Sequence, residues 1–197
     1  MRIFYIYQHF RLPFMQGGTR SYWIIKKLIE EGHKVTVIAA HPEKNKSLVS
    51  KNNYENINII WISAPYKQSL TTVDKLYIFF KFMFFSIFYS LTENYDLIYT
   101  SSTPLTVVVP ALIAKLFRRK KYILEIRDLW PEMPISLGVL NNKILIKLAL
   151  FLEKTGYENS TRLVSLSPGM EETIKSNYGL NSLMVPNFSN IEDFNIK

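Results

Sequence analysis

Arg2-Ile-Phe-Tyr-Ile-Tyr-Gln8 opens the chain with an apolar run that is typical of a buried strand. A loop with the pair Gly17-Gly18 follows, and after it comes Thr19-Arg-Ser-Tyr-Trp-Ile-Ile-Lys-Lys-Leu-Ile-Glu-Glu31, in which apolar residues recur at helical spacing. Gly32-His33 then separates this segment from a second apolar run, Val35–Ala40. Strand, helix and strand in this order predict a βαβ unit. Because such units are right-handed and build parallel sheets, the stretch predicts an α/β fold.

The glycine pair before the first predicted helix is a candidate anion site. Glycine lets a ligand approach the backbone closely, and the N–H groups and positive dipole end of a helix favour a phosphate. We therefore predict that Gly17, Gly18 and Thr19 bind the phosphate groups of a ligand. Thr19 or Ser21 is expected to cap the helix, and Gly32 to end it in a left-handed conformation. The glycines could instead serve only a tight turn, because the chain lacks the Gly-x-Gly-x-x-Gly and P-loop patterns.

The rest of the chain continues the alternation of strands and helices. We predict one Rossmann-like, doubly wound, mostly parallel sheet over residues 1–186, flanked by helices, and an interdomain linker starting at 187–197. Residues 41–56 and 134–140 are predicted to be loops. The remaining strands are expected at 57–62, 96–101, 122–126, 162–167 and 182–185, and the remaining helices at 74–93, 105–117, 141–159 and 168–178.

Composition limits the classes of function. Of 197 residues, 48% are hydrophobic, which argues against disorder, and the absence of cysteine excludes disulfides and thiolate metal sites. The net charge of +8 indicates an anionic partner such as acidic lipid or a phosphorylated substrate. No nucleic acid partner is expected, because the charge is not accompanied by a nucleic-acid-binding motif. We expect no signal peptide.

The segment 74–93 is apolar on nearly every face, with Lys75 and Lys81 as its cations. Its apolar part, about 16 residues from Leu76 to Leu91, is shorter than the roughly 20 residues that span a bilayer. Two interpretations remain open: a core helix under the sheet, or an aromatic helix lying in the membrane interface.

Two further groups of cations follow. Arg118-Arg-Lys-Lys121 ends one predicted helix, and Lys143, Lys147 and Lys154 lie in the next. Cations are favourable at a helix end for reasons of dipole alone. Together these residues could also face anionic lipid.

Polar side chains follow the strand predicted at 122–126. Ligands of open α/β sheets bind at the carboxyl ends of strands, so Arg127 and Asp128 are predicted as catalytic residues. His9, Trp130 and Ser101 are predicted to bind an acceptor or another ligand part. Arg127 and Asp128 could alternatively have a structural role, in which they pair with each other or with neighbours. No metal site is predicted, because His, Asp and Glu show no metal-ligand spacing.

Four local patterns together resemble a known family. They are the Pro13 and Gly17-Gly18 loop, Glu31-Gly-His-Lys-Val35, Arg127-Asp-Leu-Trp-Pro131, and Leu166-Ser-Pro-Gly-Met-Glu171 with Val185-Pro-Asn-Phe188. Their order and spacing resemble the N-terminal, acceptor-side domain of family-4 glycosyltransferases of the B-type fold. The Asp-Leu-Trp-Pro run looks most like the bacterial subgroup that builds O-antigens and capsules.

The resemblance implies sugar transfer from a nucleotide sugar, with retention of configuration and without a metal or another cofactor. The acceptor would be a lipid-linked saccharide, and the protein would lie in the cytoplasm on the inner face of the cytoplasmic membrane. In the family a His commonly precedes the Asp of the fifth-strand motif, whereas this chain has Arg127, which puts the role of that position in question. Asp128 is expected to hold an acceptor hydroxyl or to act as base.

The family's second domain carries the principal donor site, and the chain is expected to lack it and to be inactive alone. Two other interpretations are a non-catalytic subunit that recruits a separate catalytic chain to the membrane, and a soluble nucleotide-binding or sugar-epimerising enzyme of the same sheet class.

Overall fold

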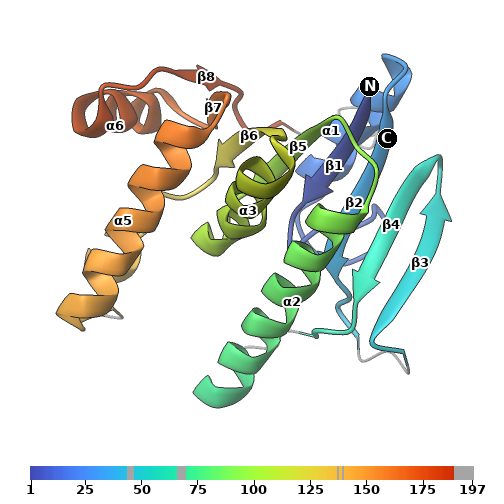
Figure 1. Ribbon diagram of the computed structural model, residues 1–197, viewed down its shortest axis with the longest axis horizontal. Helices are drawn as coiled ribbons and strands as arrows, with labels where there is room; N and C mark the ends of the chain where they lie inside the picture. The colour runs from blue at the N-terminus through green and yellow to red at the C-terminus, as the bar shows by residue number, and fades with distance from the viewer. Residues whose placement is uncertain (44–46, 66–69, 137, 139, 189–197) are drawn as a thin grey trace, which may run out of the picture.

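A computed structural model describes residues 1–197 except 44–46, 66–69, 137, 139 and 189–197. The described residues form one eight-stranded sheet with helices on both faces (Figure 1). The strands are β1 (Arg2–Ile6), β2 (Lys34–Ala40), β3 (Val49–Tyr54), β4 (Ile57–Ile62), β5 (Leu97–Ser101), β6 (Lys121–Ile126), β7 (Arg162–Ser165) and β8 (Ser182–Met184). The helices are α1 (Arg20–Glu30), α2 (Thr72–Thr92), the 3₁₀ turn η1 (Leu105–Val107), α3 (Val108–Arg118), α4 (Glu132–Ser136), α5 (Lys143–Asn159) and α6 (Pro168–Tyr178).

The strand order is β3-β4-β2-β1-β5-β6-β7-β8, and only the pairing of β3 with β4 is antiparallel. From β1 the sheet extends in one direction through β2 and β4 to the edge strand β3, and the chain then returns to the other side of β1 with β5. The order therefore reverses between β1 and β5. The predicted α/β, doubly wound, mostly parallel sheet is confirmed.

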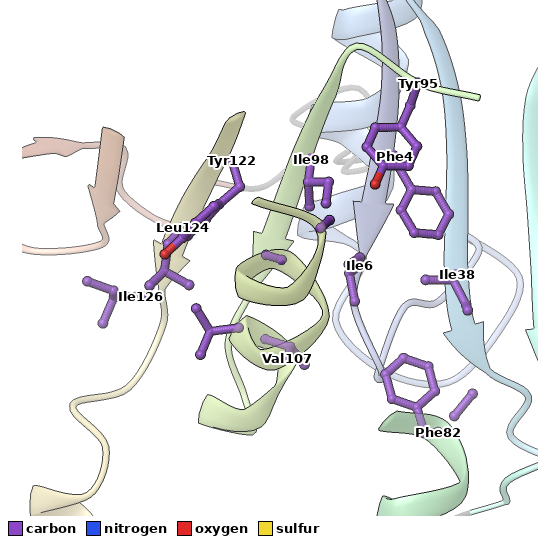
Figure 2. Packing of buried hydrophobic residues seen from close by; sticks show 14 of the residues in the cluster. Phe4, Ile6, Ile38, Phe82, Tyr95, Ile98, Val107, Tyr122, Leu124 and Ile126 are labelled. Carbon is purple, nitrogen blue, oxygen red and sulfur yellow. The ribbon is translucent and has the colours of Figure 1, made fainter. Parts of the chain in front are cut away.

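Alternate residues of the strands supply two separate cores. Phe4 and Ile6 of β1 face α2, α3 and α5, and Figure 2 shows Phe82 of α2 pointing toward Ile6 and Ile38. On the other sheet face, Tyr5 and its neighbours pack against α1. This alternation follows from the two-residue period of a strand.

Three local predictions are corrected. β3 lies inside the predicted loop 41–56, because its residues Val49–Tyr54 form an exposed, polar edge strand without an apolar run. α4 occupies part of the predicted loop 134–140, of which positions 137 and 139 lie outside the described residues. The predicted side-chain cap of α1 is wrong, because Thr19 makes no cap hydrogen bond and Ser21 is buried within the helix. Gly32 adopts the predicted positive φ, +82°.

α2 is buried on one face and exposes apolar side chains on the other. One face, with Ile78, Phe82 and Ser86, is buried against the sheet and α3. By length and composition the segment Val73–Thr92, 20 residues long, could cross a membrane, and 22% of its apolar 18-residue window is buried. The sequence had indicated an apolar part of only about 16 residues. Its outer face carries an apolar stripe, called the α2 stripe below, made of Val73, Leu76, Tyr77, Phe80, Phe84, Phe88 and Leu91.

Candidate functional site

The reversal of strand order places the candidate site at the carboxyl ends of β1, β5 and β6. Parallel registers bring these ends to one edge of the sheet. Gln8 and His9 follow β1, Thr103 follows β5, and Arg127-Asp128 follows β6. A crevice forms where neighbouring strands send their connections to opposite faces, and such crevices hold the ligands of doubly wound folds.

The glycine loop packs against the side chain of Arg11. Gly17 has φ +130°, a backbone conformation that favours glycine, and a Cβ at this residue would meet Arg11 Cγ at 3.0 Å. Gly18 has open space around its Cα. Arg11 is held in place because its Nη1 donates to the carbonyl of Phe10 at 2.7 Å. The predicted phosphate loop Gly17-Gly18-Thr19 is thus next to a cation that the sequence did not indicate.

Arg127 and Asp128 point to different partners. The Arg127 guanidinium donates to the hydroxyl of Tyr7 and lies 5.1 Å from the centre of that ring. The Asp128 carboxylate accepts from the Thr103 hydroxyl. Among the described residues no ion pair joins Arg127 to Asp128, and of the two kinds of pairing that the sequence allowed, each residue makes the one with a neighbour.

His9 lies between two cations. Burial, with the charges of Arg11 and Arg127, lowers the pKa of His9 from 6.5 to about 4. The imidazole is therefore neutral at physiological pH. The same two arginines give this end of β1 a positive field that suits a diphosphate.

His9 and Trp130 line one pocket of about 420 Å³. This pocket brings together two of the three residues that were predicted to bind an acceptor. Its other lining residues are Gln8, Lys75, Leu76, Phe79, Thr103 and Pro104.

Ser101, the third of these residues, is placed differently. It is fully buried, and its hydroxyl donates to Oε2 of Glu125 at 2.6 Å. Glu125 is also fully buried and pairs with Arg20, whose Nη2 lies 3.0 Å from Oε1. Ser101 therefore orients a buried carboxylate instead of facing the pocket.

Arg20 connects the glycine loop to the end of the described chain. It directly follows Thr19, and its guanidinium donates to the carbonyls of Val185, at 2.8 Å, and Pro186. The Phe188 ring lies 5.2 Å from the Arg20 Cζ. One buried charge thus joins α1, β6 and the segment after β8.

Sequence reasoning missed Gln8, Arg11, Arg20, Thr103 and Glu125. Glu125 could have been found, because it is a charged residue inside an apolar run, and a carboxylate in a buried strand needs a partner. Arg11 lies in the predicted loop after the first strand, and Thr103 lies between the strand predicted at 96–101 and the helix predicted at 105–117. Their proximity to the other residues depends on strand order.

We expect His9 to make stability depend on pH. Its folded pKa of about 4 is below its ordinary 6.5, so neutral His9 stabilises the fold fully above pH 6.5, and this contribution is lost as pH falls toward 4. Between pH 7 and pH 5 the loss is about 2 kcal/mol. Urea unfolding at both pH values should show this loss, and His9→Gln should reduce it. An identical pH dependence in the two proteins would contradict the assignment.

Within the described part of the chain, no group of three His, Cys, Asp or Glu residues could hold a metal ion.

The chain was compared with known proteins. Residues 17–187 match the sequence profile of the family described as "Glycosyl transferase 4-like domain". Among curated proteins, none is similar enough in sequence to match.

Solved structures share the fold. A sucrose-phosphate synthase from Thermosynechococcus elongatus is 16% identical and aligns with a TM-score of 0.69 over 98% of this chain and 49% of its own. A second, shorter structure of that synthase is 14% identical, with a TM-score of 0.58 over 98% of this chain and 92% of that one. The chain therefore spans about half the length of the longer synthase structure. The fold match and the family match over most of its length agree, and this chain belongs to the glycosyl transferase 4-like domain family.

Proposed function

We propose that the chain is the acceptor-binding N-terminal domain of a retaining glycosyltransferase that takes its sugar from a nucleotide sugar. The observation that carries this proposal is the convergence of three features at the β1/β5 switch point, in a chain of this family. These features are the glycine loop on Arg11, the Arg127 cation and the Asp128 carboxylate.

The glycine loop and the arginines serve the donor diphosphate. Gly18 leaves the backbone accessible, and Thr19 forms no side-chain cap that would compete for the first N–H groups of α1. The guanidiniums of Arg11 and Arg127 add charge, and a planar donor fork suits phosphate oxygens. No metal or other cofactor is proposed for this step. The principal nucleotide pocket is proposed to belong to a second domain.

Asp128 serves the acceptor. Its carboxylate is oriented by the Thr103 hydroxyl and follows β6 at the same sheet edge as His9. A carboxylate at this place can hold an acceptor hydroxyl and receive its proton as the new glycosidic bond forms, while the bond from the donor sugar to the diphosphate breaks and the nucleoside diphosphate leaves.

The α2 stripe supports a lipid-linked saccharide as acceptor. Phe80, Phe84 and Phe88 recur every four residues with exposed fractions of 55%, 65% and 50%. A soluble domain rarely leaves such a continuous apolar patch uncovered. An aromatic helix face of this kind suits the membrane interface.

The basic residues divide into two groups. Arg118 and Lys120 donate to carbonyls of residues 90, 93 and 95, and so they anchor the connection after α2. Lys143 and Lys147 are exposed on α5, beside the exposed apolar residues of that helix. We propose that α5 and the α2 stripe together contact anionic lipid on the inner face of the cytoplasmic membrane, in synthesis of a surface polysaccharide such as O-antigen or capsule.

Flotation with liposomes tests the membrane contact. We expect the chain to float with anionic vesicles, less so at high salt, because the cations act through a screened attraction. Phe80→Ser with Phe84→Ser should weaken binding about tenfold or more, since each removes a large apolar side chain from the interface.

The matched control replaces exposed apolar residues elsewhere, Leu48→Ser with Leu183→Ser. This variant should float like the parent protein. Equal flotation of both double variants, or no binding of the parent, would reject the membrane contact.

Sugar transfer tests the enzyme class. The complete gene product is incubated with labelled nucleotide sugars and lipid extracts, and incorporation into the lipid phase is measured. Incorporation supports the proposal. Membrane binding without incorporation by the complete product would instead favour a non-catalytic recruiting subunit.

A further inference from the structure

The Arg20 guanidinium is buried, and most of its hydrogen-bond donors are in use. Nε and Nη2 donate to Oε1 of Glu125, at 3.2 and 3.0 Å. Nη2 also donates to the carbonyl of Val185 at 2.8 Å, and Nη1 donates to the carbonyl of Pro186. These bonds use four of the five N–H groups of an arginine. Although Arg20 directly follows Thr19 of the glycine loop, its guanidinium is thus committed to the protein and not to a phosphate ligand.

The segment after β8 is fixed at several points. The Val185 N–H donates to the carbonyl of Ser165 at 2.8 Å, and the next two carbonyls along the chain are those that accept from Arg20. The Phe188 ring lies 5.2 Å from Arg20 Cζ and lines a groove along α1. In the sheet, β5, β6 and β7 separate β8 from β1 (Figure 1). The contacts with Arg20 therefore bring the chain from an edge strand back to the start of α1.

These contacts decide where the polypeptide leaves the sheet. Phe188 is the last residue that the structure describes, and it lies against Arg20. The glycine loop ends at Thr19, one residue before this arginine. A domain that follows in the chain is therefore connected beside the loop that is proposed to hold the donor phosphates.

We propose that Arg20 is a positioning residue that fixes the start of the interdomain linker beside the glycine loop, and so sets how a following donor-binding domain meets that loop. The inference rests on the proposed function, which supplies the second domain. Arg20 acts through the linker and does not touch the nucleotide sugar. The shape of its side chain matters as well as its charge, because one planar group reaches a carboxylate and two carbonyls at once. A lysine keeps the charge for Glu125 but cannot hold all three groups.

The first test is cleavage of the chain by chymotrypsin after Phe188, followed by mass spectrometry. A protease needs a released, extended segment around the bond that it cuts, so the contacts with Arg20 should protect this bond. Arg20→Lys should raise the rate of cleavage after Phe188 at least fivefold, because it frees the carbonyls of residues 185 and 186. Arg162→Lys makes the same substitution at an exposed arginine and should be cut like the parent.

The double variant Arg20→Met with Glu125→Leu separates the anchoring of the linker from the stability of the fold. It leaves no unpaired buried charge, so its urea unfolding should be close to that of the parent. Cleavage after Phe188 should nevertheless stay raised at least fivefold, because methionine offers the two carbonyls no donor. This variant also serves if Arg20→Lys does not fold. Cleavage at the parental rate in a folded Arg20 variant would overturn the proposal.

The second test uses the complete gene product. Arg20→Lys should raise the KM for the nucleotide sugar at least threefold and change the KM for the acceptor less than twofold, because the linker directs the donor-binding domain. Arg162→Lys should change neither constant. Equal changes in both KM values, or none in either, would reject the positioning role.

The cleavage test needs no turnover, so its failure is distinguishable from failure of the proposed function. Cleavage that depends on Arg20, in a complete product that transfers no sugar, would retain the anchor and reject the transferase role. Sugar transfer together with cleavage that does not depend on Arg20 would reject only the anchor.

Discussion

Asp128→Asn is expected to lower kcat of sugar transfer by about 10²- to 10⁴-fold, the range typical of losing a positioned proton acceptor. Asparagine has the same size and can still accept from the Thr103 hydroxyl, so the fold is expected to remain intact. It cannot take the proton that the acceptor hydroxyl releases. Initial rates with the complete gene product, at saturating donor and acceptor, measure the effect.

The control is Glu172→Gln, which removes one carboxylate charge from an exposed position of α6. Its rate should equal that of the parent enzyme. Arg127→Ala gives a second comparison. Because Arg127 is proposed to contact the diphosphate of the nucleotide sugar, Arg127→Ala should raise the KM for the nucleotide sugar more than Asp128→Asn does. Near-normal rates in both Asp128→Asn and Arg127→Ala would remove the site at the end of β6.

Glu125→Leu is expected to destabilise the chain by about 3–5 kcal/mol. The variant leaves the Arg20 guanidinium, with a side chain only 5% exposed, without its carboxylate. It also removes the acceptor of the Ser101 hydroxyl. Urea unfolding followed by circular dichroism measures the loss.

The double variant Arg20→Met with Glu125→Leu should recover much of this stability, because it removes the unpaired charge. Glu31→Gln is the comparison at the surface. Its partner Lys27 is 3.6 Å away and both side chains are exposed, so the change should cost less than about 1 kcal/mol. If Glu125→Leu lowered the free energy of unfolding as little as Glu31→Gln does, the buried pair would not hold α1 in place.

The α/β class could be predicted because apolar runs and helical periodicity are local properties. β1, α1 and β2 lie where the first forty residues predict them. β3 could not be predicted in this way. Its polar residues pair only because β4 offers an edge, and pairing partners are not encoded in the strand's own pattern.

The candidate site shows the same division. Gly17 and the strand-end residues Arg127 and Asp128 were recognisable from local pattern and chain position. Gln8, Arg11 and Thr103 gained significance only from their neighbours in space.

The amino-acid sequence by itself determined that a glycine loop precedes the first helix and that charged residues follow a buried strand. Only the tertiary structure decided that Ser101 faces Glu125, that Arg127 and Asp128 diverge, and that α2 exposes an apolar stripe. The physical reason is that burial, hydrogen-bond partners and pKa depend on contacts between residues far apart in the chain. The order of strands across the sheet selects those contacts.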